Sequence, residues 1–317
     1  MPIFIEEGDY EKGFAEYYKS KIAPILSGVE EERLLKLSSY TKRKMIGIPV
    51  MILIIIGAFY MEGTMNGGGD FLQMGGGLCV IVWGIIYAPV LKYKQDLKSQ
   101  YLPILSSFFG DLKYELKPSE FENAEIAKME IFPSYTTLEA EDYFGGSYKN
   151  VPLNMREMKL TKKHGRSRST VFQGLVIALT FPKSFKGKTA LKKDGGMIFN
   201  MFGKPNLGPK TEKIVLEDPD FEAIFEVYGT DQIEARYLLT TAFMERLLKL
   251  SEARGKGASV QCEFTGTSLV IMVESKVNLF EPGNIKTSAL KLDDLHLFLK
   301  QMHEIFILID TLKLDRV

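Results

Sequence analysis

Two apolar runs separated by a short polar segment constrain this chain more than any other feature. Residues 45–61, MIGIPVMILIIIGAFYM, and residues 71–91, FLQMGGGLCVIVWGIIYAPVL, are 17 and 21 residues long. An α-helix needs about 20 predominantly apolar residues to cross the hydrocarbon core of a bilayer, within a range of about 17–25. Neither run has the polar stripe of a helix that packs on a soluble core. We therefore expect a transmembrane hairpin over 45–91, with two helices buried in a large soluble core as the alternative.

The charges around the runs predict their orientation. The flanks outside the hairpin are basic, with Lys36, Lys42, Arg43 and Lys44 before it and Lys92, Lys94 and Lys98 after it. The loop 62–70 between the runs, EGTMNGGGD, has two acids and no Lys or Arg. Because cytoplasmic flanks carry the Lys and Arg excess, both termini are expected in the cytoplasm and only the loop outside.

The composition of the runs favours an anchor over a pore. Neither contains a charged residue, whereas transport and proton relay usually depend on an ionisable group inside the membrane. The two cysteines, Cys79 in the second run and Cys262 far downstream, are not expected to meet. This agrees with a reducing compartment for most of the chain. Residues 1–44 are too polar for a cleavable signal.

The N-terminal residues 1–44 are expected to form a cytoplasmic helical segment. Aromatic and aliphatic residues recur there at helical spacing, interrupted at Pro24 and Gly28. Its apolar face would pack on the chain's own domain, or alternatively on a membrane surface or partner.

Residues 92–317 are expected to form one cytoplasmic α+β domain with mostly antiparallel strands and long C-terminal helices. Segments rich in strand formers are bounded by Gly, Pro and Ser clusters. The expected strands include 153–160, 170–181 and 188–193, and the hairpin of SVQCEF with SLVIMVES. The turn KKHGRSRS, 162–169, should join the first two. Helical periodicity returns over 231–250, with a break at Thr240–Thr241, and over 292–312.

A basic segment is the most distinctive feature of this domain. Residues 156–193 hold eleven Lys and Arg against one acid, while residues 115–148 hold eight acids against two bases. The expected membrane- or partner-facing surface consists of Lys162, Lys163, Arg166, Arg168, Lys183, Lys186, Lys188, Lys192 and Lys193. It could bind anionic lipid. The alternatives are a solvated face or pairing with the acidic segment; nucleic acid is disfavoured because no binding motif surrounds these residues.

No catalytic, metal or cofactor site is predicted. His296 and His303 share a helix face but do not make a metal site by themselves, and Cys262 has no recognisable His partner. Asp218, Asp220 and Glu222 fit no calcium loop. No phosphate loop, nucleophile elbow or zincin helix occurs.

Three stretches carry a family resemblance: VFQGLVIALTFPKSFKGKT (171–189), LEDPDFEAIFEVYGTDQIEARYLLTTAFMERLLKL (216–250) and CEFTGTSLVIMVESKVNLFEP (262–282). They closely resemble the bacterial family known as domain of unknown function 3137, and the resemblance covers roughly residues 100–313. Thr241 departs from the family, where proline is common.

The resemblance implies a bacterial cytoplasmic membrane protein with two N-terminal spans. It supplies no activity, substrate or catalytic residue. Glu234, Arg236 and Tyr237 within its EARYLL motif are either a site or an ion pair beside an apolar helix face.

The leading functional hypothesis is a non-catalytic adaptor or regulator that presents a cytoplasmic domain at the inner leaflet to an unknown protein partner or to the membrane. The alternative is a membrane-tethered enzyme with its active site in residues 100–317.

Overall fold

The computed structural model describes residues 2–65, 67–117, 126, 129–193, 207–253, 259–275, 278, 280, 281, 283–289 and 291–311. The chain divides into two compact units. The helical unit comprises Met1–Leu102 and Glu281–His296, and the sheet unit comprises Pro103–Phe280 and Leu297–Val317. Long apolar helices near the N-terminus and an antiparallel sheet confirm the mixed α+β class.

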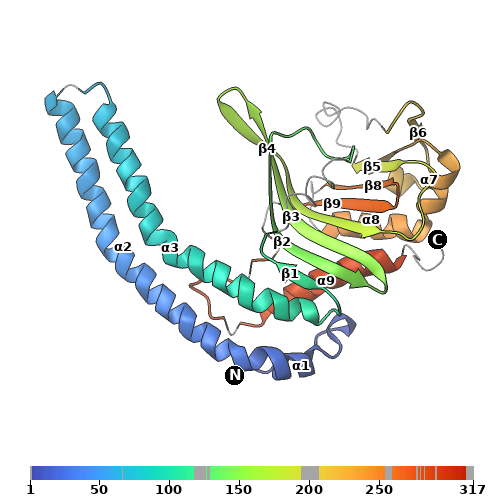
Figure 1. The fold of residues 1–317 in the computed structure, drawn as a ribbon, viewed down its shortest axis with the longest axis horizontal. Helices are drawn as coiled ribbons and strands as arrows, with labels where there is room; N and C mark the ends of the chain where they lie inside the picture. The colour runs from blue at the N-terminus through green and yellow to red at the C-terminus, as the bar shows by residue number, and fades with distance from the viewer. Residues whose placement is uncertain are drawn as a thin grey trace. The chain divides into compact units, whose positions relative to one another are not determined.

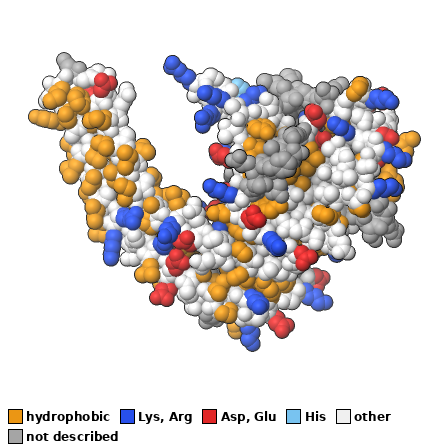
Figure 2. Space-filling view, in the orientation of Figure 1, with side chains coloured by type: hydrophobic (Ala, Val, Ile, Leu, Met, Phe, Trp, Pro, Cys, Tyr) orange, Lys and Arg blue, Asp and Glu red, His pale blue; other side chains and the backbone are white. Residues whose placement is uncertain are grey.

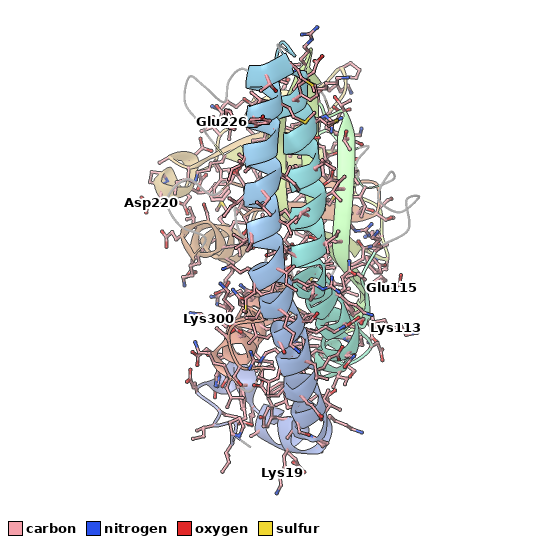
Figure 3. All side chains as sticks on the ribbon, turned by 90° about the vertical axis from the view of Figure 1, so that its left-hand side faces the viewer. Lys19, Lys113, Glu115, Asp220, Glu226 and Lys300 are labelled. Atoms are coloured by element: carbon pink, nitrogen blue, oxygen red, sulfur yellow. The ribbon has the colours of Figure 1, made fainter. Side chains whose placement is uncertain are left out.

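The helical unit is built on two long helices. Its elements are a 3₁₀ turn at Asp9–Glu11, α1 at Phe14–Tyr17, a π turn at Tyr18–Ile22, α2 at Ala23–Met65 and α3, which starts at Asp70 and ends at Ser107 in the sheet unit. Helices α2 and α3 run side by side (Figures 1 and 3). The apolar runs 45–61 and 71–91 lie inside these longer helices. The predicted interruption at Pro24 and Gly28 is wrong, because α2 continues through both. Pro24 stands in the first turn, where proline is tolerated.

Small residues let α2 and α3 approach each other. A Cβ atom at Gly47 of α2 would collide with the side chain of Ile86, and one at Gly75 of α3 would collide with Ala58. Small residues at such contacts allow close backbone packing, which is the main source of helix association in lipid.

Polar contacts hold both ends of this helix pair. At the loop end, the Glu62 carboxylate accepts from the backbone N–H of Gly69 (2.6 Å) and of Phe71 (3.2 Å). It thereby places a negative charge at the N-terminus of α3, where the helix dipole favours it. At the other end, Arg43 Nη1 donates to the carbonyl oxygen of Ile85 (2.9 Å). Pro89 stands four residues after Ile85 and has no N–H, so Arg43 supplies the donor that the helix cannot.

The segment 281–296 packs on α2 within the helical unit. Arg33 is 6% exposed and donates from Nη1 to the Ile285 carbonyl (2.6 Å) and from Nε and Nη2 to Glu30 (2.9 and 2.7 Å). Glu30 accepts in turn from the Ala289 N–H (2.8 Å). The Arg33 guanidinium is the main cause of the lowered pKa of Glu30. We call Glu30, Arg33, Ile285 and Ala289 the Arg33 staple.

A second charged contact holds the same segment on α3. The Glu281 carboxylate meets Lys94 Nζ at 2.7 Å and Lys98 Nζ at 3.0 Å. Burial raises the pKa of Glu281, but the two ammonium groups outweigh burial and leave that pKa below its usual value. The segment therefore belongs with α2 and α3 although it follows the sheet in sequence.

The sheet unit contains nine described strands in one sheet. Their bounds are β1 Lys113–Glu115, β2 Thr137–Tyr148, β3 Val151–His164, β4 Ser167–Thr180, β5 Thr189–Lys193, β6 Glu212–Ile214, β7 Phe225–Gly229, β8 Val260–Thr265 and β9 Ser268–Glu274. The spatial order is β1-β2-β3-β4-β9-β8-β5-β7-β6, and all described neighbours are antiparallel (Figure 1).

Both faces of the sheet are covered by apolar side chains. The helices of this unit are α6 Pro219–Glu222, α7 Gln232–Leu238, α8 Thr241–Ala253 and α9, which starts at Asp293 in the helical unit and ends at Thr311. On one face, Phe243 of α8 packs edge-to-face on Phe264 (6.0 Å between ring centroids) and Phe298 of α9 packs near Phe144 (6.3 Å). On the other, Ile131 and Leu207 join a buried cluster with side chains from five strands.

Most expected elements of the sheet unit are confirmed, and the extent of one turn is corrected. The hairpins β3–β4 and β8–β9 form, and a break at Leu239–Thr240 separates α7 from α8. The expected turn over 162–169 is wrong in extent, because both strands continue until only Gly165 and Arg166 remain between them. Gly165 has φ +60°, as a two-residue hairpin loop with glycine first requires. Residues 118–125, 127 and 128 of the acidic segment and Leu312 lie outside the described part.

Candidate functional site

Of the nine Lys and Arg residues in the predicted basic surface, four lie together at the end of the β3–β4 hairpin. Lys162 and Lys163 are on β3, Arg166 is in the turn and Arg168 is on β4. All but the half-buried Lys162 are exposed, and Figure 2 shows Lys and Arg side chains gathered at this tip. We call residues 162–169 the basic arm.

The arm extends beyond the neighbouring strands of the sheet. The described pairing of β2 with β3 ends at Thr137↔Thr161, and that of β9 with β4 begins at Gly174↔Glu274. The hairpin is long because the β3–β4 register continues to His164↔Ser167. It places Lys163 directly opposite Arg168, although like charges in that position destabilise a strand pair.

The other five predicted cations lie elsewhere. Lys183, Lys186 and Lys188 are in the connection that follows the opposite end of β4, and Lys192 and Lys193 are on β5. Strand β4 has 14 residues, and at about 3.3 Å per residue it separates its two ends by roughly 40 Å. The nine side chains therefore do not form one patch.

Two basic side chains of the same segment are structural. Lys192 is half-buried, and burial lowers the pKa of its ammonium group, against the opposing influence of Glu263 and Glu130. Arg156 is fully buried, lies over the Tyr143 ring at 4.9 Å and donates to Asn154 Oδ1 at 2.7 Å. Charge counted along the sequence thus overstates the charge that the surface presents.

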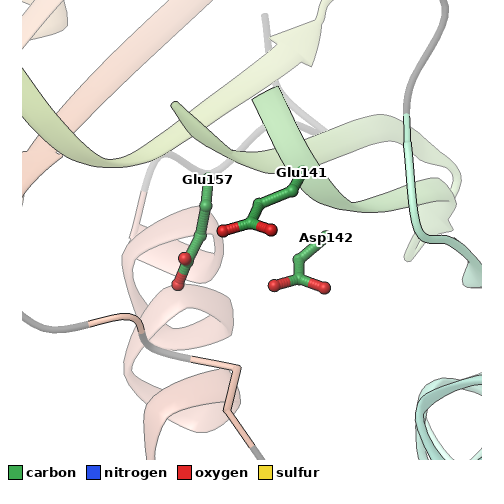
Figure 4. Close-up of side chains that lie close together, drawn as sticks. All are labelled: Glu141, Asp142 and Glu157. Atoms are coloured by element: carbon green, nitrogen blue, oxygen red, sulfur yellow. The ribbon is translucent and has the colours of Figure 1, made fainter. Parts of the chain in front are cut away.

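Three carboxylates form a cluster that sequence reasoning missed. Ligand-type oxygens of Glu141, Asp142 and Glu157 lie within 4.8 Å of one another (Figure 4). Glu141 on β2 is the direct cross-strand partner of Glu157 on β3, and a bulge after Glu141 gives Asp142 a φ of 53°. Asp142 and Glu157 are buried, whereas Glu141 is exposed.

Each member of the cluster accepts a hydrogen bond from the sheet unit. Tyr114 Oη donates to Asp142 Oδ1 (2.6 Å), Asn278 Nδ2 donates to Glu141 Oε1 (3.1 Å) and the Phe280 N–H donates to Glu157 Oε1 (3.3 Å). Carboxylates this close can share a proton or bind a hard divalent cation. The signal in the sequence was Glu157, the one acid of the basic segment, but only the β2–β3 register brings it to Glu141.

The residues of the EARYLL motif have structural roles or are exposed. Glu234 accepts from the backbone N–H groups of Lys186 (2.7 Å) and Gly187 (2.6 Å), so it fixes the connection before β5. Arg236 and Tyr237 are exposed on α7. The ion pair considered from the sequence is thus replaced by contacts of Glu234 with backbone.

The other residues considered for metal or catalytic roles also have structural roles in the fold. His296 Nδ1 contacts the fully buried Glu11 carboxylate at 2.6 Å, and its ring stacks on Phe4. Asp218 caps α6 through the N–H groups of residues 220 and 221. Cys262 is buried, and burial raises the pKa of its thiol, which makes it a poor nucleophile.

Comparison with known proteins agrees with the resemblance seen in the sequence. Residues 170–314 match the family described as protein of unknown function (DUF3137). The matched part runs from the start of the apolar half of β4 through α9, and it supports the family resemblance of this region. Residues 100–169, which the resemblance was expected to include, lie outside the match.

Among curated proteins, nothing matches this chain. Among solved structures, the mycobacterial trehalose monomycolate transport factor A, TtfA, aligns with 11% identity over 65% of this chain and 87% of that one, with a TM-score of 0.36. A TM-score of that size supports no conclusion about fold or function.

Proposed function

We propose that this protein is a membrane-anchored, non-catalytic adaptor or regulator that holds its sheet unit at the cytoplasmic face of a bacterial inner membrane. The observation that carries the proposal is the surface of α2 and α3. Both are long and apolar enough to cross a membrane. Side chains such as Leu53, Phe59 and Val80 are more than 60% exposed. In hydrocarbon surroundings this apolar surface is removed from water, which is favourable by about 25 cal/mol of free energy per Å² of apolar surface.

The polar contacts within the helix pair support an anchor rather than a transport path. Glu62 and Arg43 lie at the two ends of the apolar runs. In the described contacts, both side chains hydrogen-bond to backbone groups of the same helix pair. The runs between them hold no charged residue. An adaptor is preferred to an enzyme because the carboxylate cluster is hydrogen-bonded to the protein's own donors.

Alkaline carbonate extraction and topology mapping test the proposal. A Cys79→Ala background carries a single new cysteine, either Thr64→Cys at the exposed end of α2 beyond the first apolar run or Ser20→Cys in the N-terminal segment. A membrane-impermeant thiol reagent should label position 64 in intact spheroplasts and position 20 only after permeabilisation. The native Cys262 is buried and serves as the internal control. Release of the protein by carbonate, or labelling of both positions before permeabilisation, would refute a two-span anchor.

Partner capture tests the adaptor role. Crosslinking of the full chain in native membranes, followed by purification, should recover one protein at constant stoichiometry. The comparison chain keeps α2 and α3 intact and has the exposed Arg236 and Tyr237 of α7 changed to Ala. It shows whether these two side chains take part in the capture of the partner. Recovery of no specific protein from either chain would contradict an adaptor.

A further inference from the structure

The basic arm carries cations on both faces and at its tip. Side chains alternate between the faces of a strand, and Lys163 and Arg168 are cross-strand partners, so these two share one face. Lys162 lies on the other face and Arg166 is in the turn. A ribbon with charge all round does not pack against a protein core; it suits surroundings that are anionic on every side.

The fold leaves these charges without compensation from their own hairpin. Residues 158–170 contain no acid. The pairing of β3 with β2 ends at Thr161, apart from a hydrogen bond that the Lys163 N–H donates to Thr136 Oγ1 (3.0 Å), and the pairing of β4 with β9 begins at Gly174. In the described strand pairs, no acid therefore lies directly opposite a residue of the arm. The like pair Lys163 and Arg168 is repulsive as it stands. An anionic ligand between or beside the two would convert this repulsion into attraction.

The composition of the arm indicates which anion it takes. Its sequence, KKHGRSRS, has no Phe, Tyr or Trp on which a nucleobase could stack, and single-stranded nucleic acid binding usually depends on such stacking. It has no apolar side chain that would fill a protein groove. Lys, Arg and Ser are instead the donors that bind phosphate.

We propose that the basic arm binds the phosphate headgroups of anionic lipids in the leaflet to which the chain is anchored. This rests on the proposed function, because the anchor holds the sheet unit near the leaflet and raises the effective concentration of lipid around it. Each Lys or Arg near an anionic leaflet strengthens binding about fivefold. The arm contacts headgroups only, since nothing in it is apolar enough to enter hydrocarbon.

Full-length protein reconstituted in vesicles tests the arm directly. A polarity-sensitive fluorophore is attached at Ser169→Cys in a Cys79→Ala background, and a second sample carries it at the exposed Ser184, in the connection at the opposite end of β4. Lipids brominated near the headgroup quench a nearby fluorophore. In vesicles containing phosphatidylglycerol, the label at 169 should be quenched and the label at 184 much less. In pure phosphatidylcholine, or in about 1 M salt, quenching at 169 should be lost because charges are screened within about 3 Å.

Charge variants separate the arm from net charge. Changing Lys162, Lys163, Arg166 and Arg168 together to Gln should abolish the quenching at 169. The matched control removes four exposed cations elsewhere, by changing Lys183, Lys186, Lys210 and Lys300 to Gln, and should retain it. Equal quenching in neutral and anionic vesicles, or equal loss in both variants, would overturn the proposal. Loss of the quenching at 169 when excess single-stranded RNA is added at physiological salt would overturn it too, because the arm would then prefer nucleic acid to lipid.

Failure of the arm is distinguishable from failure of the anchor. Without the anchor, the wild-type chain would not float with vesicles of pure phosphatidylcholine, to which the arm does not bind. Without lipid binding by the arm, the chain floats with both and the label at 169 stays unquenched.

Discussion

Loss of the Arg33 guanidinium should release the segment 281–296 from α2 while the helices themselves remain folded. Arg33→Ala removes the donor to the Ile285 carbonyl and both bonds to Glu30. Glu30 then keeps only the Ala289 N–H among the contacts of the staple. The side chains of Arg33 and Glu30 are 7% and 19% exposed, so water replaces the lost bonds poorly.

The size of the effect follows from the type of bond. Hydrogen bonds to charged groups contribute about 1.5–3 kcal/mol each. Water that reaches Glu30 in the variant recovers part of this free energy. The free energy needed to open the segment locally should therefore fall by about 2–3 kcal/mol. At 1.4 kcal/mol per factor of ten, protection of the Ala289 N–H against hydrogen exchange should fall about 30- to 150-fold.

Hydrogen exchange with mass spectrometry of the full chain in detergent measures this protection. Trypsin cleavage after the exposed Lys286 gives a second readout and should become faster. Arg33→Lys keeps the charge but cannot bind Glu30 bidentately, so its effect should be intermediate. Arg236→Ala, on the exposed face of α7, is the matched control. A change of less than threefold in Arg33→Ala would refute the reasoning.

Three further predictions follow from single contacts. Arg43→Ala should loosen the helix pair by on the order of 1 kcal/mol, and by less when Pro89→Ala restores an N–H for the Ile85 carbonyl; a double-mutant cycle without coupling would contradict this. Glu141→Gln should raise the stability of the sheet unit by about 0.2–1 kcal/mol, because it removes a like-charge cross-strand pair; a denaturant titration in EDTA that shows a loss would count against it. Burial raises the pKa of Glu263, so the contribution of this side chain to stability is greatest below the usual carboxyl pKa and falls as pH rises through the raised folded-state pKa. Melting of Glu263→Gln should lack that fall, and parallel pH profiles would rule the explanation out.

Local sequence was enough to predict elements whose pattern is short-range. The hairpin β8–β9 follows from two strand-forming runs around TGT, and the break between α7 and α8 follows from Thr240, whose Oγ accepts from the Phe243 N–H (3.3 Å). The basic arm was located in the same way, but its turn was expected to be longer. Continuation of the strands to His164 and Ser167 depends on a two-residue turn at Gly165 that the wider run of polar residues obscured.

The candidate sites show where local patterns stop being informative. Nine cations within 32 residues look like one surface, but a 14-residue strand carries some of them to opposite ends of the sheet. Arg156 contributed to the charge count of residues 156–193 and is buried over Tyr143. In contrast, Glu141 and Glu157 are separated by a turn and two strand segments and meet only because the β2–β3 register pairs them.

By itself the sequence determined the two long apolar helices, the mixed α+β class and the resemblance of residues 170–314 to the DUF3137 family, because hydrophobic length, periodicity and motif order are properties of consecutive residues. Tertiary structure alone decided that four cations form an arm, that three carboxylates form a cluster and that residues 281–296 pack on α2 and α3. Each of these depends on strand register or on a contact between distant segments, such as Arg33 with Ile285. Such contacts form where backbone pairing and burial bring distant segments together, and local sequence patterns do not predict which distant segments will meet.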